Sequence, residues 1–341
     1  MGKREIERKE KFLKNIYDTI KEFNLIENGD KLVLGVSGGP DSICMLDVLD
    51  KIRKDEKYNL SFEIVVAHIN HMIREEASLD EKYVYDYCNK KNIEFYSKSI
   101  DVQKLANNNK IGTEEAGRIA RYEFLNEILQ KTNSDKIAIA HNKNDNAETI
   151  IMHLLRGSGI KGLKGIDPKR EKIIRPLINC ERIDIETYCK ENNLEPRIDK
   201  NNFENIYTRN KIRNIVIPYI EREYNPNIIQ AINNLSKMVK DEDNYIEKKV
   251  KESYNKLLIE ENDKEITIDL KDFNKQENVI KSRLLLYIIT RLFGDTNQIS
   301  NIHIIDIIKL CNNNIGNKYT CPNKKIKILI KNQKIYFIKQ V

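Results

Sequence analysis

The sequence predicts an α/β protein, with a parallel sheet in its N-terminal part and a smaller, mostly helical domain after it. Two observations lead to this prediction. Up to about residue 195, short apolar runs typical of buried strands alternate with helical patterns. Beyond Pro218 and the pair Asn225-Pro226 the alternation stops, and longer helical patterns follow. We therefore predict two domains, 1–224 and 225–341.

The N-terminal domain begins with an amphipathic helix over 8–25, which has apolar residues at helical spacing. The run 31–36 is almost continuously apolar, as expected for a strand that is buried on both faces. The predicted strands are 31–36, 62–69, 94–100, 136–140 and 172–178, and the predicted helices between or after them are 41–52, 75–91, 113–129, 145–155 and one from about 181. Helices that connect parallel strands cover both faces of the sheet, so we expect a Rossmann-like arrangement.

The C-terminal domain has fewer strand signals. We expect helices over 228–260 and 278–293, with a short strand near Ile266 between them. Two alternating apolar runs within 325–338 flank the polar residues 331–334, which predicts a terminal hairpin.

Composition narrows the class of protein. With 40% hydrophobic and 33% charged residues, the 341-residue chain has enough apolar material for a globular core. We find no apolar run near the roughly 18 residues that a membrane span needs, and no secretory signal, so we expect a cytoplasmic protein. The six cysteines include no CxxC pair, which argues against a disulfide framework or a zinc knuckle. The net charge of +7 suits a polyanionic partner without requiring one.

The strongest motif follows the first predicted strand and opens a helix: Ser37, Gly38, Gly39, Pro40, Asp41 and Ser42. The glycines let the main chain approach a ligand closely, and the helix N-terminus that follows attracts an anion. The two serines add hydroxyl donors, and Asp41 is suited to a Mg²⁺ ion that bridges phosphate oxygens. The Walker sequence GxxxxGK[ST] is absent. An ordinary capped turn is the plainer alternative, but the six residues in this context favour a pyrophosphate-binding loop, and hence the use of ATP.

Three further segments place polar residues near the ends of strands. Segment 68–74 (HINHMIR) carries two histidines, an asparagine and an arginine, although a histidine at a strand end is often structural. Segment 114–122 (EEAGRIARY) is equally compatible with a helix that has one buried and one solvated face. In segment 140–149 (AHNKNDNAET), Asp145 and Glu148 share one helical face beside His141. Such acidic residues often only complement the helix dipole, but a pair beside a histidine favours a cation or amine ligand.

The positions of these segments support a functional reading. They lie at the carboxyl ends of strands or on the helices that follow, which is the edge of an open parallel sheet where ligands bind. The segment 155–163 (LRGSGIKGL) then adds a basic, glycine-rich loop.

With these segments the sequence closely resembles the tRNA(Ile)-lysidine synthetases, a family within the PP-loop ATP pyrophosphatases. The resemblance covers about residues 30–226 and continues through Arg175-Pro176-Leu177, 199–202, Tyr207, Arg209-Asn210 and Arg213. LRGSGxxGL followed by RNxxR is more specific to this family than the PP-loop itself. Asn201 and Met72-Ile73 depart from the usual residues, Ser and Gly-Leu.

The resemblance implies a two-step reaction on a tRNA(Ile) with a CAU anticodon. The C2 oxygen of the wobble cytidine attacks the α-phosphate of ATP, which releases pyrophosphate and adenylates the base. The ε-amine of L-lysine then attacks C2 and expels AMP. The product, lysidine, changes codon specificity from AUG to AUA. The family also suggests a homodimer, and its longer members carry a further C-terminal domain, so we expect this chain to position tRNA differently.

The same resemblance assigns roles to single residues. The implied catalytic residues are Asp41, His141, Asp145, Glu148, Arg121 and Arg213. ATP binding is expected from residues 37–42 together with His68, Arg156 and Gly157. Mg²⁺ is expected at Asp41 and Asp145, and tRNA at Arg209, Asn210 and Arg213, with residues 225–341 as a tRNA-binding domain.

Within this assignment, Asp145 and Glu148 bind the lysine ammonium or the metal, and His141 helps to remove a proton from the amine. Three alternatives remain. A wobble-base thiolase commonly uses cysteine pairs, which this sequence lacks. An amidotransferase-like ligase needs a glutaminase domain or an N-terminal cysteine, and this sequence has neither of these two features. A catalytically silent tRNA-binding module is disfavoured by the intact carboxylates beside the intact loop.

Overall fold

The computed structural model describes residues 3–70, 77–197, 207–295, 299–313 and 318–340. It divides into two compact units, Met1–Lys237 and Met238–Val341, which we describe one at a time. The boundary predicted at residue 224 lies at the end of helix α10 (Ile217–Glu223), thirteen residues before this division.

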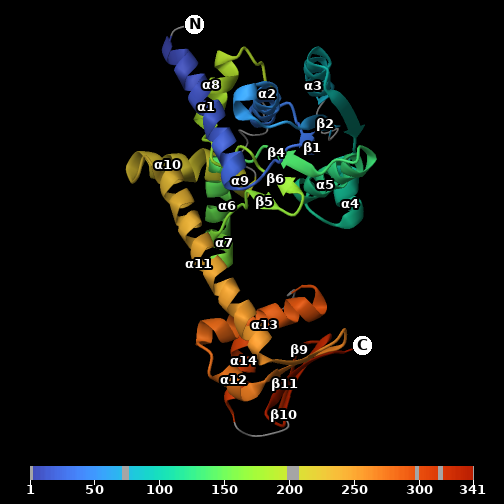
Figure 1. Cartoon of the computed structure of the whole chain (residues 1–341), viewed down its shortest axis with the longest axis vertical. Helices are drawn as coiled ribbons and strands as arrows, with labels where there is room; N and C mark the ends of the chain where they lie inside the picture. Colours follow the sequence, from blue (N-terminus) through green and yellow to red (C-terminus); the bar gives the residue numbers. More distant parts are fainter. Residues whose placement is uncertain (1–2, 71–76, 198–206, 296–298, 314–317, 341) are drawn as a thin grey trace. The chain divides into compact units, whose positions relative to one another are not determined.

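The first unit is built on a six-stranded sheet in the order β3-β2-β1-β4-β6-β5. Its strands are β1 (Lys31–Gly35), β2 (Glu63–Asn70), β3 (Glu94–Ser99), β4 (Lys136–Ile139), β5 (Lys169–Arg170) and β6 (Ile173–Ile174). All neighbouring pairs are parallel except β5 with β6 (Figure 1). This confirms the predicted parallel α/β fold. The order reverses between β1 and β4, and such a switch point is where open sheets bind ligands.

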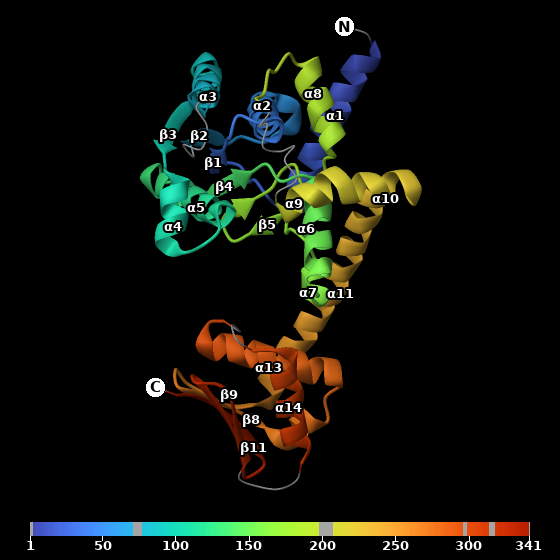
Figure 2. The same cartoon turned by 180° about the vertical axis from the view of Figure 1, so that it is seen from behind.

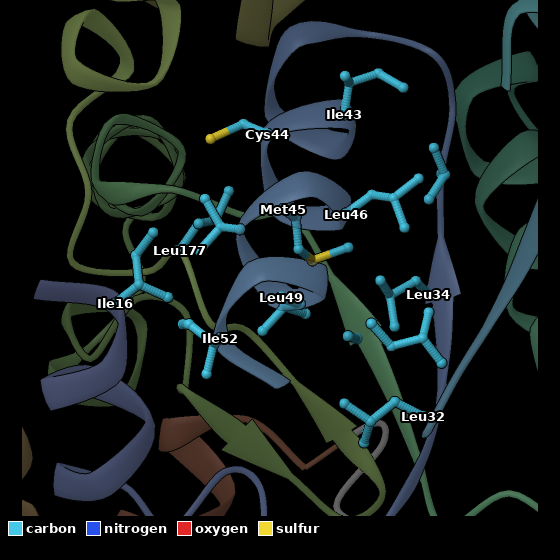
Figure 3. Close-up of a cluster of buried hydrophobic side chains, with 14 of the residues drawn as sticks. Ile16, Leu32, Leu34, Ile43, Cys44, Met45, Leu46, Leu49, Ile52 and Leu177 are labelled. Atoms are coloured by element: carbon cyan, nitrogen blue, oxygen red, sulfur yellow. The ribbon is translucent and has the colours of Figure 1, made fainter. Parts of the chain in front are cut away.

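The side chains of β1 point alternately to the two faces of this sheet and are buried on both. Leu32 and Leu34 point toward α1 (Lys3–Glu22), α2 (Pro40–Lys54) and α8 (Arg182–Glu191), where they pack with Ile16 and Leu46 (Figure 3). Val33 faces the other way, onto α5 (Thr113–Lys131). Period-two burial of this kind explains why the strand is apolar throughout.

The other helices of the first unit are α3 (Ala77–Lys91), α4 (Val102–Asn109), α6 (Lys143–Leu155), α7 (Ile160–Leu163), α9 (Thr208–Lys211) and α10, with a 3₁₀ turn at Glu56–Tyr58, a π-helical segment at Ile212–Val216 and the start of α11 (Ile228–Leu257). Two expectations differ from the structure. The strand predicted over 172–178 is only two residues long, because Pro176 lacks the N–H that a ladder needs. Helix α4 was not predicted.

The second unit contains an antiparallel sheet in the order β7-β8-β11-β10-β9. Its strands are β7 (Leu258–Glu261), β8 (Glu265–Asp269), β9 (Lys318–Asn323), β10 (Ile326–Lys331) and β11 (Lys334–Lys339). Its helices are the end of α11, α12 (Leu270–Asn274), α13 (Asn278–Phe293) and α14 (Asn301–Asn312). The predicted hairpin is confirmed as β10–β11, with Asn332 and Gln333 at φ of 50° and 60° in its turn. The strand near Ile266 is confirmed as β8, whereas β7 and β9 were not expected.

Across the described residues, none of the helices combines the length and the apolar character that crossing a membrane demands.

Candidate active site

The loop after β1 is held closed by its own serines. The Ser42 hydroxyl accepts a hydrogen bond from the Ser37 N–H (3.1 Å) and donates one to the Gly39 carbonyl (3.0 Å). Gly38 has φ +88°, a conformation that favours glycine. Gly39 is the N-cap of α2 and has no side chain with which to cap it, while Pro40 occupies the first turn. The N-terminus of α2 is therefore left open to an anion.

His68 supports this loop from the neighbouring strand. Its Nδ1–H donates to the Val36 carbonyl at 2.9 Å, since a carbonyl can only accept. The ring is buried, and burial lowers the pKa of His68, so the neutral form is favoured. The structure thus brings His68 to the end of β1, where it braces the segment that leads into Ser37. The rest of this motif, residues 71–74, lies outside the described residues.

Asn142 connects the loop helix α2 to the helix α6. Its side-chain Nδ2 donates to Asp41 Oδ1 at 2.8 Å, and its Oδ1 accepts from the Asp145 N–H at 2.9 Å. Asp145 Oδ2 in turn accepts from the Asn142 N–H at 3.0 Å, which completes a reciprocal N-terminal cap. Asn142 was not singled out as a site residue. An asparagine at a strand-to-helix turn is a typical N-cap residue, and this signal would have identified Asn142.

The ionised form of Asp41 is energetically unfavourable at its position in the fold. Burial raises its pKa, and the nearby charge of Asp145 raises it further, to about 6. A cation between the two carboxylates would relieve this repulsion, so Asp41 and Asp145 suit Mg²⁺, which uses one or two carboxylates and completes its shell with water and phosphate oxygens. The described residues contain no group of three His, Cys, Asp or Glu side chains arranged for a metal.

Asp145 and Glu148 lie one turn apart on α6 and are both buried. Arg213 Nε donates to Glu148 Oε1 at 2.7 Å and its Nη2 to Asp145 Oδ1 at 3.0 Å. Arg209 Nε donates to Glu148 Oε2 at 2.8 Å and its Nη2 to Asp145 Oδ1 at 3.2 Å. Arg182 Nη2 reaches the same two carboxylates at 3.4 Å.

Three guanidinium groups thus surround two carboxylates. We call these five side chains, Asp145, Glu148, Arg182, Arg209 and Arg213, the charge cluster. The charge cluster by itself has one more positive than negative charge, and Asp41 beside Asp145 offsets this charge when it is ionised. The sequence predicted four of the five residues but not that they pair with one another. Arg182 was missed because it lies on α8, beyond the last motif in that region, and nothing in the local sequence marks it.

His141 sits at the end of β4, next to Asn142. Burial lowers its pKa to about 4, and the positive charges of Arg175, Arg209 and Arg121 contribute. Arg175 Nε donates to His141 Nδ1 at 3.0 Å, so the ring is neutral and carries its proton on Nε2. Arg175 is buried and fixed by its Nη1, which donates to the Asp167 carbonyl at 2.7 Å. Arg121, on α5, is exposed.

Two of the predicted residues lie away from this centre. Arg156 and Gly157 are exposed at the C-terminal end of α6, whereas Asp145 is in its first turn. A helix of 13 residues separates its ends by about 18 Å. The structure therefore does not bring Arg156 and Gly157 to the PP-loop. Asn210 is half-buried on α9, next to Arg209, and residues 199–202 lie outside the described ranges.

Comparisons with known proteins agree with this geometry. Residues 7–220 match the family described as PP-loop domain. Over 329 residues the chain is 44% identical to a tRNA(Ile)-lysidine synthase of Clostridioides difficile, an alignment that covers 94% of this chain and 70% of that protein. Over 311 residues it is 43% identical to a protein of the same name from Clostridium tetani, with 91% and 65% covered. The chain thus spans about two thirds of the length of these relatives.

Among solved structures, the U34-tRNA thiolase NcsA from Methanococcus maripaludis has a TM-score of 0.54 and 19% identity, with 67% of this chain and 80% of that chain covered. At this level of identity, the likeness supports the fold alone.

Proposed function

We propose a reaction for this chain from the premise that it belongs to the tRNA(Ile)-lysidine synthase family of PP-loop proteins. It uses ATP to adenylate the C2 oxygen of the wobble cytidine in a CAU-anticodon tRNA(Ile), and the ε-amine of L-lysine then attacks C2 and expels AMP. The product is lysidine, which changes decoding from AUG to AUA. The observation that best supports this function is the charge cluster, because it places an amine-binding carboxylate pair and phosphate-binding arginines beside a nucleotide loop.

The PP-loop binds the pyrophosphate end of ATP in this proposal. Gly38, Gly39 and the first turn of α2 offer main-chain N–H groups, and Ser37 and Ser42 add hydroxyls. Because the loop is already closed by Ser42, little reorganisation is needed when negative charge develops on the departing pyrophosphate. Asp41 and Asp145 would hold Mg²⁺, which would neutralise charge on the phosphate oxygens.

In the proposed reaction, the arginines and the carboxylates of the charge cluster change partners when the substrates bind, and this exchange serves both steps. In this structure Arg209 and Arg213 neutralise Asp145 and Glu148. When ATP and tRNA bind, their phosphates attract the arginines, since planar guanidinium groups bind phosphate in two-point fashion. The carboxylates are then free to accept the ammonium of lysine. This exchange makes lysine binding depend on the other two substrates, which limits release of AMP without transfer.

His141 requires a revised role. We predicted that it removes a proton from the attacking amine, but its Nδ1 lone pair already accepts from Arg175 and its Nε2 carries a proton. In this state the ring is a hydrogen-bond donor, so it is better suited to orienting a phosphate or carbonyl oxygen. To act as a base, it must first lose the hydrogen bond from Arg175.

The remaining site residues are assigned to the phosphates of ATP and to the tRNA. Arg121 is exposed near Arg209 and remains available to the α-phosphate or the anticodon backbone. Asn210 and the released Arg209 and Arg213 would contact the anticodon as well. The second unit contributes tRNA binding, and a homodimer is part of the proposal by family analogy. Because Arg156 and Gly157 lie far from the loop, we assign them to tRNA rather than to ATP.

The test is AMP release that depends on lysine. The protein is incubated with radiolabelled ATP and unmodified CAU-anticodon tRNA(Ile), with and without L-lysine, and AMP is separated chromatographically. We expect AMP to form only when both tRNA and lysine are present. A tRNA that differs only in its anticodon is the matched control. AMP release that is indifferent to lysine would reject the proposal, and release that requires a sulfur donor would support a thiolase instead.

A further inference from the structure

The first turn of α6 carries a buried polar side chain, Asn146, to which the proposed reaction gives no role. Asn146 follows Asp145 directly, on a helix that lies beside the start of α11 (Figure 2). Its Nδ2 donates to Asn233 Oδ1 of α11 at 2.8 Å, and its Oδ1 accepts from the Ile166 N–H at 2.6 Å. Both polar atoms of this amide are therefore bound to segments outside α6.

Asn233 returns this contact to the main chain of α6. Its Nδ2 donates to the Lys143 carbonyl at 3.1 Å and to the Ile229 carbonyl of its own helix at 2.8 Å. Two points in the first turn of α6, the Lys143 carbonyl and the Asn146 side chain, are thus bound to one side chain of α11. We call Asn146 and Asn233 the amide pair.

The segment after α7 packs so closely on the amide pair that it requires a glycine. Gly165 has φ +65°, and a Cβ on it would lie 2.1 Å from Asn146 Oδ1. The Ser236 hydroxyl of α11 donates to the adjacent Lys164 carbonyl at 2.7 Å. Residues 164–166 are therefore held against both α6 and the start of α11.

Apolar contacts between α6 and α11 do not by themselves fix how α6 is turned about its axis. Ala147 and Ile151 of α6 pack with Ile229 of α11, and such packing is non-directional. Hydrogen bonds to a buried amide, in contrast, require particular distances and angles. The amide pair therefore fixes the rotation and the axial position of α6 where this helix presents Asp145 and, one turn later, Glu148.

We propose that Asn146 and Asn233 are positioning residues, which hold Asp145 and Glu148 where the ammonium of the lysine substrate binds. This inference rests on the proposed function in taking that substrate to be lysine. The PP-loop is closed by hydrogen bonds of its own serines, none of which involves the amide pair. Loss of the amide pair should therefore weaken the binding of lysine more than the binding of ATP.

The experiment compares Asn233→Ala with Asn234→Ala, which removes an exposed asparagine from the next position of the same helix. Asn233 is only half-buried, so its variant is expected to fold. Lysine-dependent AMP release with CAU-anticodon tRNA(Ile) gives kcat and the KM values for lysine and ATP. We expect Asn233→Ala to raise the KM for lysine about fivefold or more, with kcat and the KM for ATP within about twofold of the wild type. Asn234→Ala should leave all three unchanged.

Two further comparisons test whether the amides act as a pair. Asn146→Ala, alone or combined with Asn233→Ala, should raise the KM for lysine by about the same factor as Asn233→Ala, because each variant removes the same contact. Gly165→Ala should have this effect too, since its Cβ would displace Asn146. Its control is Gly29→Ala, which also has a left-handed φ (+89°) but whose Cβ would meet no described residue beyond its chain neighbours within 4 Å.

Hydrogen–deuterium exchange tests the amide pair without any substrate. We expect peptides that cover 143–149 and 164–166 to exchange about fivefold or more faster in Asn233→Ala than in the wild type, and at the wild-type rate in Asn234→Ala.

An unchanged KM for lysine in Asn233→Ala would overturn the proposal, even with a lower kcat, because a residue that only supports folding reduces the amount of active protein and not its affinity for lysine. If the wild-type protein forms no lysidine, the proposed reaction fails on its own. The exchange rates then decide whether the amide pair holds α6, and rates that do not change in Asn233→Ala would reject it.

Discussion

Arg213 and Glu148 form a two-point ion pair inside the first unit. Arg213 Nε lies 2.7 Å from Glu148 Oε1, and its Nη2 lies 2.9 Å from Oε2. Glu148 is completely buried, so this pair is shielded from water and salt. An ammonium ligand can reach Glu148 only in competition with such a guanidinium. In this structure the protein's own arginines therefore occupy the carboxylate oxygens that an ammonium ligand would need.

Replacing Arg213 with alanine tests this competition. We expect L-lysine to bind the substrate-free Arg213→Ala protein about fivefold or more tightly than the wild type, because one competing cation is gone. Release of pyrophosphate from ATP should become slower in the same variant, since the arginine is also assigned to phosphate. Equilibrium dialysis with labelled lysine and a pyrophosphate assay measure the two effects.

A neighbouring arginine serves as the control for this substitution. Arg222, on α10, is mostly exposed and pairs with Glu223 at 2.5 Å. Arg222→Ala should leave both quantities unchanged. If Arg213→Ala weakens lysine binding and leaves pyrophosphate release intact, the exchange of partners is wrong.

Asp41→Asn is expected to stabilise the protein while it abolishes adenylation. The pKa of Asp41 is raised from 3.8 to about 6, chiefly by burial, so the folded protein holds this proton more tightly than the unfolded chain. The contribution of Asp41 to stability is therefore lost as the pH rises through 6. Asparagine keeps an acceptor for Asn142 without the charge.

The unfolding temperature of Asp41→Asn should exceed that of the wild type at pH 8, and the difference should shrink toward pH 4. Pyrophosphate release should fall about a hundredfold or more. A variant that is less stable than the wild type at pH 8, or that still releases pyrophosphate normally, would contradict the assignment of Asp41.

Asp47, on the same helix, should behave in the opposite way. Burial alone would raise its pKa, but hydrogen bonds from Lys51, Tyr188 and Tyr87 lower it overall. Both tyrosine hydroxyls lie 2.6 Å from its carboxylate, and Lys51 Nζ lies 2.8 Å away. The folded protein thus holds this proton less tightly, so Asp47 contributes stability above its ordinary pKa and loses it as the pH falls through the lowered one.

Asp47→Asn should cost about 2 kcal/mol or more of unfolding free energy at pH 7, measured by urea denaturation. The deficit should begin to diminish below about pH 4, where Asp47 of the unfolded chain takes up a proton while the folded carboxylate is still ionised. A deficit that is constant down to pH 3 would show that the charge of Asp47 does not matter.

The sequence predicted the fold of the first unit well where the strands are buried on both faces. The runs that became β1, β2 and β4 are apolar because both faces of the sheet are covered, and their order followed from the alternation with helices. The second unit was harder to predict. β7 is short and acidic, and β9 contains Pro322, so neither carries the alternation that marked β10 and β11.

The sequence predicted some members of the site, but it did not single out Asn142 or Arg182, and it did not predict how the charged side chains pair. Strand ends pointed to Asp41, His141 and Asp145, because position along a parallel sheet follows from sequence order. Which arginine pairs with which carboxylate depends on where α8, α9 and the π-helical segment Ile212–Val216 lie against α6, and no local pattern encodes that. The proton position on His141 is set by Arg175, 34 residues away in the chain, so the sequence alone could not assign it.

The central claim is that the chain attaches lysine to a nucleobase through the ε-nitrogen. The most direct measurement uses L-lysine labelled with ¹⁵N only at that nitrogen, together with ATP, Mg²⁺ and unmodified CAU-anticodon tRNA(Ile). Nucleosides from the digested tRNA are then analysed by mass spectrometry. We predict one modified cytidine, at the wobble position, that retains the ¹⁵N label in the bond to its base. Unmodified cytidine at that position, from folded protein that binds both tRNA and ATP, would contradict the account.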